Sequence, residues 1–127
     1  MTASIPDIYS SIHMLLDNYV PPLTPRAEGN NNRYDMYYPH SVELFGKNYP
    51  ELYFAGVAAY EKYVALYFFP IYSHPTEFTD IPDALKKMLK GKSCFHIKSG
   101  EDAVMKAIRL LLDSGFSFYQ SKGLIKK

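Results

Sequence analysis

From Glu51 to Pro70 the chain reads ELYFAGVAAYEKYVALYFFP. Runs rich in aromatic and β-branched residues lie on both sides of the charged pair Glu61 and Lys62. This pattern is typical of an antiparallel β-hairpin that is buried on at least one face. The hairpin predicts the architecture of the chain, but no catalytic group stands out within it.

Alternation along the two strands predicts which side chains share a face of the sheet. In the first strand, the odd positions 53 to 59 lie on one face and the even positions 52 to 60 on the other. Both faces are apolar, so we expect a central pair of strands covered by helices on one face and partly screened by tyrosines on the other. Gly56 predicts a bulge or a close approach by a neighbouring element. Four hairpin residues are expected to be largely buried: Phe54, Val57, Leu66 and Phe68.

The segment before the hairpin is predicted to hold one helix, one loop and two extended stretches. Apolar residues recur at helical spacing over residues 6–19, and Ser4 is a suitable N-cap. Residues 21–33 are rich in proline, glycine and asparagine, which predicts a solvated loop. The next elements are expected to be extended stretches at 34–39 and 41–45 and a turn at 46–50.

After the hairpin, the sequence predicts two helices with a short strand between them. Thr79 and Asp80 are expected to cap the first helix, and Gly91 to follow its end in a left-handed conformation. Residues 93–97 are typical of a short strand. The stretch from Ser99 to Asp102 resembles a capping box, which opens a single helix over residues 101–121 despite the interior Gly115.

The order of these elements predicts an α+β fold. We expect a single domain over residues 1–127, in which an antiparallel β-sheet with a central aromatic hairpin packs against N-terminal, middle and C-terminal helices. Residues 1–33 are expected to form the N-terminal helix and loop, ahead of the core of the domain.

The composition is that of a globular protein: 127 residues, 47% hydrophobic and 21% charged, with a net charge of +1. Such a chain can bury its own core, and its charge argues against nucleic acid as a partner. The single cysteine, Cys94, excludes an internal disulfide and indicates a cytoplasmic setting. The chain has no secretory signal pattern and no apolar stretch of the roughly 20 residues that a membrane span needs.

A resemblance to a known family rests on five segments, residues 53–60, 63–67, 85–87, 91–96 and 115–119. Together they resemble the YdhG-like family of small bacterial proteins of unknown function, and the resemblance covers roughly residues 34–121. The family usually has a Tyr-Gly-Met-Pro type strand where this chain has residues 34–39, so the glycine is replaced and the proline displaced. The resemblance implies an α+β fold with a curved antiparallel sheet. Some relatives look similar to frataxin, which implies a role in iron delivery.

Metal binding is one candidate function. The histidines have no partner at ligand spacing, and the chain has no Cys-x-x-Cys pair. The closest acidic pair, Glu101 and Asp102, is explained by helix capping. We therefore expect no metal site and no cofactor, and only weak binding of iron without a defined site.

Cys94 and His96 are the second candidate. Alternation along residues 93–97 places both on the tyrosine-bearing face and directs Phe95 and Ile97 into the core. Nearby lysines favour a thiolate, whereas a free cysteine is more commonly a buried, inert residue.

The third candidate is a run of basic residues without a carboxylate: Lys86, Lys87, Lys90, Lys92 and Lys98. The simplest interpretation of this run is the solvated face of a helix.

Two interpretations of function remain open. The first is a non-enzymatic domain, monomeric or homodimeric, that binds a small ligand or a protein partner on a tyrosine-rich sheet surface. A frataxin-like iron carrier is a special case of this interpretation. The alternative is a minor enzyme or anion-binding protein that uses Cys94, His96 and the neighbouring lysines. No catalytic residue is assigned, and the candidate ligand-binding residues are Tyr37, Tyr60, Tyr63, Lys92, Cys94 and His96.

Overall fold

The computed structural model describes residues 4–28, 32–78 and 81–125. Its elements, in chain order, are α1 (Ile5–Asp17), β1 (Thr24–Glu28), β2 (Arg33–Tyr38), β3 (Val42–Leu44), β4 (Lys47–Tyr49), β5 (Leu52–Ala59), β6 (Val64–Phe68), α2 (Phe69–Ser73), the 3₁₀ turn η1 (Pro75–Glu77), α3 (Asp83–Lys86), β7 (Leu89–Lys90), β8 (Cys94–Ile97) and α4 (Asp102–Ser121).

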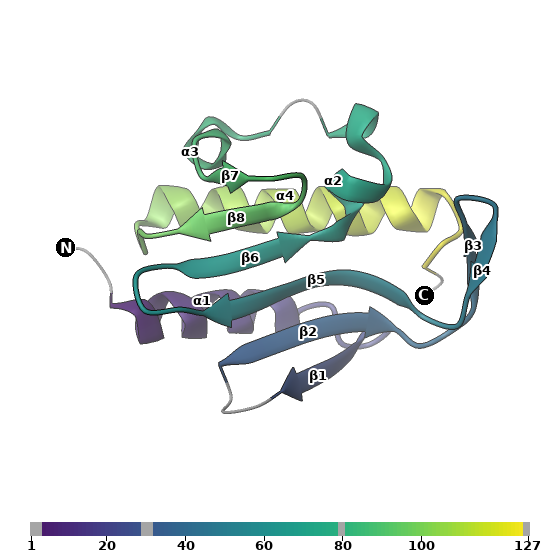
Figure 1. The fold of residues 1–127 in the computed structure, drawn as a ribbon, viewed down its shortest axis with the longest axis horizontal. Coiled ribbons are helices and arrows are strands. Elements are labelled where there is room, and N and C mark those ends of the chain that lie inside the picture. Colours follow the sequence, from purple (N-terminus) through teal and green to yellow (C-terminus); the bar gives the residue numbers. More distant parts are fainter. Residues whose placement is uncertain (1–3, 29–31, 79–80, 126–127) are drawn as a thin grey trace.

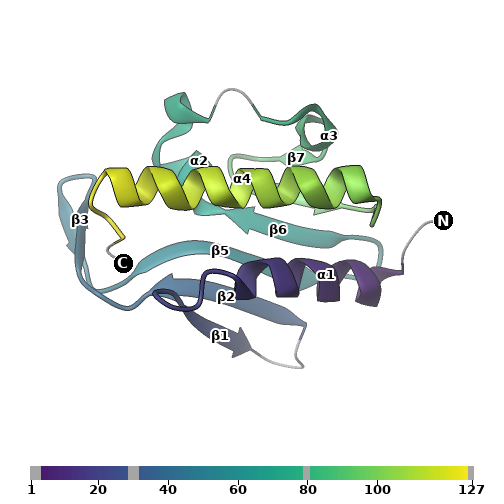
Figure 2. The same ribbon diagram turned by 180° about the vertical axis from the view of Figure 1, so that it is seen from behind.

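The elements form a sheet that is covered by helices on one face. Six antiparallel strands lie in the order β1-β2-β5-β6-β8-β7, and β3 and β4 form a separate hairpin at one end. Figures 1 and 2 show that α1 and α4 lie along the same face of the six-stranded sheet. The expected α+β fold with a central β5–β6 hairpin is therefore confirmed. We call the face away from α1 and α4 the open face.

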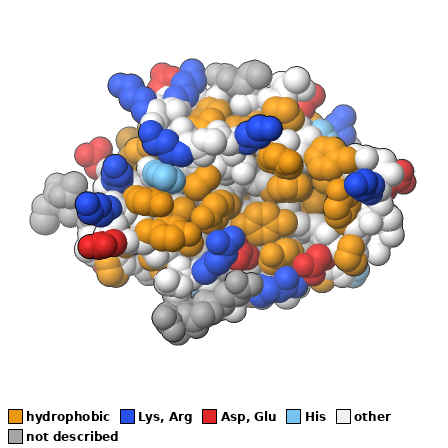
Figure 3. Space-filling model, in the orientation of Figure 1, with side chains coloured by type: hydrophobic (Ala, Val, Ile, Leu, Met, Phe, Trp, Pro, Cys, Tyr) orange, Lys and Arg blue, Asp and Glu red, His pale blue; other side chains and the backbone are white. Residues whose placement is uncertain are grey.

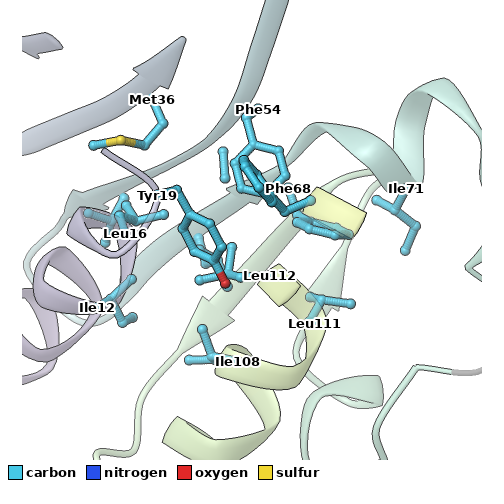
Figure 4. Packing of buried hydrophobic residues seen from close by; sticks show 14 of the residues in the cluster. Ile12, Leu16, Tyr19, Met36, Phe54, Phe68, Ile71, Ile108, Leu111 and Leu112 are labelled. Atoms are coloured by element: carbon cyan, nitrogen blue, oxygen red, sulfur yellow. The ribbon is translucent and has the colours of Figure 1, made fainter. Parts of the chain in front are cut away.

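The core lies between the sheet and the two long helices. The stripe of α1, made by Ile8, Ile12 and Leu16, is fully buried, as helical spacing of apolar residues predicts. On the sheet, the rings of Phe54 and Phe68 pack edge to face against each other, and Phe54 packs in the same way against Phe116 and Tyr119 of α4. Figure 4 shows the core side chains converging around Phe54 and Phe68. The four hairpin residues that were expected to be buried are all fully buried: Phe54, Val57, Leu66 and Phe68.

Both long helices begin and run much as predicted. The Ser4 hydroxyl accepts a hydrogen bond from the backbone N–H of Asp7 and caps α1. Helix α4 continues without a break through Gly115, where a β-carbon would overlap the ring of Phe68. The interior glycine therefore lets α4 approach β6 closely. The predicted capping box is wrong, because the Ser99 hydroxyl accepts a bond from Glu101, one residue before the helix.

A bulge in β5 changes the predicted alternation. Tyr37 faces Tyr53 and Met36 faces Ala55, so Phe54 is an extra residue in its strand. Tyr53 is thereby moved to the open face, away from the odd-numbered residues with which it was grouped. Gly56 lies at the close approach that the sequence predicted. A β-carbon at this position would overlap the hydroxyl of Tyr53 and the carboxylate of Asp35 on the neighbouring strand β2.

Two short strands, β1 and β4, lie where the sequence predicted a loop and a turn. β1 lies within the expected loop 21–33, and β4 lies within the expected turn 46–50. Both are polar strands, and β1 pairs with β2 at the edge of the sheet. A strand at the edge of a sheet pairs on one side only, so half of its backbone N–H groups need no partner in the sheet. Pro25, which has no backbone N–H, can therefore be part of β1.

The predicted middle helix is reduced to the single turn of α3, which buries Leu85. Its expected caps, Thr79 and Asp80, lie outside the described residues. The chain then turns into β7, which pairs with β8 at the opposite edge of the sheet. Gly91 does have a positive φ of 75°, as predicted, but in the turn between these two strands. No helix in the described part of the chain is long and apolar enough to cross a membrane.

Candidate functional site

The open face carries a group of stacked rings, which we call the aromatic ladder: Tyr60, Tyr63, Tyr67 and His96. The Tyr63 ring lies flat against the imidazole of His96, with centroids 4.0 Å apart, and also stacks on Tyr60. The hydroxyls of Tyr60 and Tyr67 are 3.2 Å apart, within hydrogen-bond distance. Figure 3 shows hydrophobic side chains gathered across the middle of this face, with charged side chains around them.

β8 contributes Cys94 and His96 to the open face in the predicted register. Cys94 lies opposite Tyr67 on β6, whereas Phe95 and Ile97 are fully buried in the core. Burial raises the pKa of the Cys94 thiol, and the nearby Arg33 opposes this shift only in part. The group is thus a thiol at neutral pH, contrary to the thiolate that neighbouring lysines were expected to favour.

The sequence did not predict the buried carboxylate of Asp35, which lies on β2. Asp35 is only 2% exposed and accepts hydrogen bonds from Arg33 Nε at 2.7 Å and from the Tyr53 hydroxyl at 2.8 Å. Burial and the carboxylate together raise the pKa of Tyr53, and the hydrogen bond to Asp35 raises the pKa of Arg33. Gly56 lies opposite Asp35 and leaves room for it. This glycine was the sequence signal that could have revealed the carboxylate.

Tyr37 lies apart from the aromatic ladder, on β2. The Arg26 guanidinium lies 3.9 Å from the centre of the Tyr37 ring and pairs with both carboxylate oxygens of Glu51, at 2.9 and 3.1 Å. The Tyr37 ring also contacts Tyr53. The structure therefore places the predicted tyrosines at two separate positions on the open face.

Lys92 lines a pocket to which neither Cys94 nor His96 belongs, although all three were predicted to act together. Lys92 lies in the turn between β7 and β8, and the pocket lies beside the β7 edge of the sheet. We call it the edge pocket; its volume is about 790 Å³. Its walls come from the β3–β4 turn, α2, η1 and the chain around α3 and β7: Phe45, Ile71, Tyr72, Pro75, Phe78, Ile81, Leu89, Gly91 and Lys92.

A second pocket of about 390 Å³ lies on the other side of Phe45 and Tyr72. These two side chains belong to the linings of both pockets, and they remain 56% and 48% exposed. They form a ridge between the two hollows. Large apolar side chains exposed next to concave surfaces are a common feature of binding sites.

The backbone of Phe45 is unusual for a residue of its size. Its φ is +57° and that of Gly46 is +72°, so both central residues of the β3–β4 hairpin turn have positive φ. Turns of this kind favour Asn-Gly or Gly-Gly, and a side chain with a β-carbon pays about 1–2 kcal/mol in the left-handed region. The sequence reasoning ended a strand at this residue and missed the turn. The strained position presents the Phe45 ring to both pockets.

Metal-binding groups are not brought together in the described residues: no three of the His, Cys, Asp and Glu side chains there are placed to hold an ion.

Comparisons with protein-family models, with curated proteins and with solved structures found no match to this chain. The resemblance to the YdhG-like family stays a prediction.

Proposed function

We propose that this chain is a non-enzymatic binding domain that takes an apolar small molecule into the edge pocket. The observation that carries the proposal is the lining of that pocket, in which Phe45 is held in a strained conformation beside Ile71, Phe78 and Leu89. A volume of about 790 Å³ lies within the range of small-molecule sites, about 300–1,000 Å³. Residues held in strained backbone conformations cluster at active sites and ligand-binding sites.

The charged groups of the open face favour binding over catalysis. The Asp35 carboxylate is occupied by Arg33 and Tyr53, so it is poorly placed to take a proton from a substrate. The raised pKa of Cys94 speaks against the alternative interpretation, an enzyme that uses this thiol as a nucleophile. The aromatic ladder remains the predicted surface for a ligand or partner of the same domain.

The proposal is tested with N-phenyl-1-naphthylamine, a neutral apolar probe whose fluorescence rises on leaving water. We expect saturable binding of one probe per chain, and Phe45→Asn should weaken it by about tenfold, equivalent to 1.4 kcal/mol. Met14→Asn is the matched control, because it removes another large, exposed apolar side chain, on α1 and outside the lining of the edge pocket. Absence of saturable binding, or equal affinity in the Phe45 variant and the wild type, would overturn the proposal.

A further inference from the structure

We infer that the ligand of the edge pocket is an amphipathic monocarboxylate, whose apolar body lies in the pocket and whose carboxylate binds Lys92; this rests on the proposed function. Lys92 is the only charged side chain among the described lining residues, and none of them is acidic. A pocket with apolar walls and one cation fits a ligand that carries one negative charge at one end.

Lys92 is one of several cations whose charge is not paired with a carboxylate in the described part of the chain. Arg26 pairs with Glu51, Arg33 with Asp35 and Lys86 with Asp83. No ion pair in the described part of the chain includes Lys92, and its side chain is exposed in the β7–β8 turn. An anion can therefore reach this ammonium group without displacing a carboxylate of the protein.

The neighbouring lysines add a positive field at the same side of the pocket. Between Leu85 and Lys98 the chain has five lysines and no carboxylate, and Leu89 and Gly91 within this stretch line the pocket. Figure 3 shows Lys and Arg side chains grouped over α3 and β7. Exposed charges act over about 10 Å at 0.1 M salt, so this group attracts an anion to the mouth of the pocket. In this proposal the lysines of residues 86–98 attract the anionic ligand, in addition to keeping the surface of this segment solvated.

The cation also selects among anions. A lysine ammonium is a point charge, whereas doubly charged phosphate groups are usually held by several donors or by the two-pronged arginine guanidinium. No arginine belongs to the described lining of the edge pocket. The apolar walls then favour a longer hydrocarbon body, because each methylene group buried strengthens binding by about fourfold.

The test is displacement of N-phenyl-1-naphthylamine by three ligands of equal chain length: decanoate, 1-decanol and decylammonium. We expect decanoate to bind about tenfold more tightly than decanol, a difference of 1.4 kcal/mol, and decylammonium to bind most weakly. Octanoate should bind about sixteenfold more weakly than decanoate, at about fourfold for each of two methylene groups. The preference for decanoate should decrease as salt is added.

Lys92→Met keeps most of the apolar length of the side chain and removes its charge. We expect this variant to bind decanoate and decanol equally, while Lys62→Met, in the exposed turn between β5 and β6, keeps the preference. Equal binding of the acid and the alcohol by the wild type, or an unchanged preference in Lys92→Met, would overturn the carboxylate assignment. Binding of the probe without displacement by any of the decyl compounds would overturn it as well. Failure of the probe itself to bind would instead overturn the proposed function.

Discussion

Phe45→Asn is expected to weaken ligand binding without lowering the free energy of unfolding, so it tests the two roles of Phe45 separately. The Phe45 ring is 56% exposed, so less than half of the 1.5–3 kcal/mol available from burying such a side chain is realised, about 1 kcal/mol. Against this loss, the left-handed conformation costs a phenylalanine about 1–2 kcal/mol, and asparagine tolerates it better. We therefore expect the variant to be as stable as the wild type or more stable, by up to about 1 kcal/mol.

The free energy of unfolding is measured by urea denaturation, supported by the melting temperature. A gain of 1 kcal/mol corresponds to about 4 °C for a domain of this size. Gly46→Ala is the matched control in the same turn: alanine at a φ of +72° should lower stability by about 1 kcal/mol. A loss above about 1.5 kcal/mol in Phe45→Asn would refute the reasoning, because the ring would then be holding the fold together and not simply lining a site.

Four further predictions concern the core, the open face and metal binding. Phe68→Ala, at a fully buried position, should lower the free energy of unfolding by about 3–5 kcal/mol in urea denaturation; a loss below about 1 kcal/mol would place the ring outside the core. Gly56→Ala should cost about 1–3 kcal/mol by the same measurement, because the new methyl group overlaps Asp35 and Tyr53, and a neutral result would contradict that packing. Native Cys94 should react with iodoacetamide at pH 7 more slowly than a free cysteine, because its raised pKa lowers the thiolate fraction, and should speed up as the pH rises towards that pKa; alkylation as fast as in the unfolded chain would restore the enzymatic alternative. Ferrous iron, titrated anaerobically, should bind more weakly than about 1 μM, and tighter stoichiometric binding would favour the frataxin-like role.

The sequence by itself determined the elements whose patterns are local. The 3.6-residue spacing of Ile8, Ile12 and Leu16 predicted α1, and the aromatic and β-branched run at 63–69 predicted β6. Alternation along residues 93–97 predicted β8 and the outward direction of Cys94 and His96. These elements each bury one continuous apolar face, so the repeat of hydrophobic residues along the chain is sufficient to identify them.

Only the tertiary structure decided the edges of the sheet and the placement of the candidate site. β1, β4 and β7 have no apolar alternation of their own, and they form because a neighbouring strand supplies hydrogen-bond partners, which no local pattern records. The bulge at Phe54 likewise depends on the partner strand, and it alone brings Tyr53 to Asp35. Lys92 is two residues from Cys94 in the chain, yet Lys92 lines the edge pocket and Cys94 lies on β8 opposite Tyr67. The edge pocket joins Phe45 to Lys92 across distant segments, and such a juxtaposition exists only once the chain has folded.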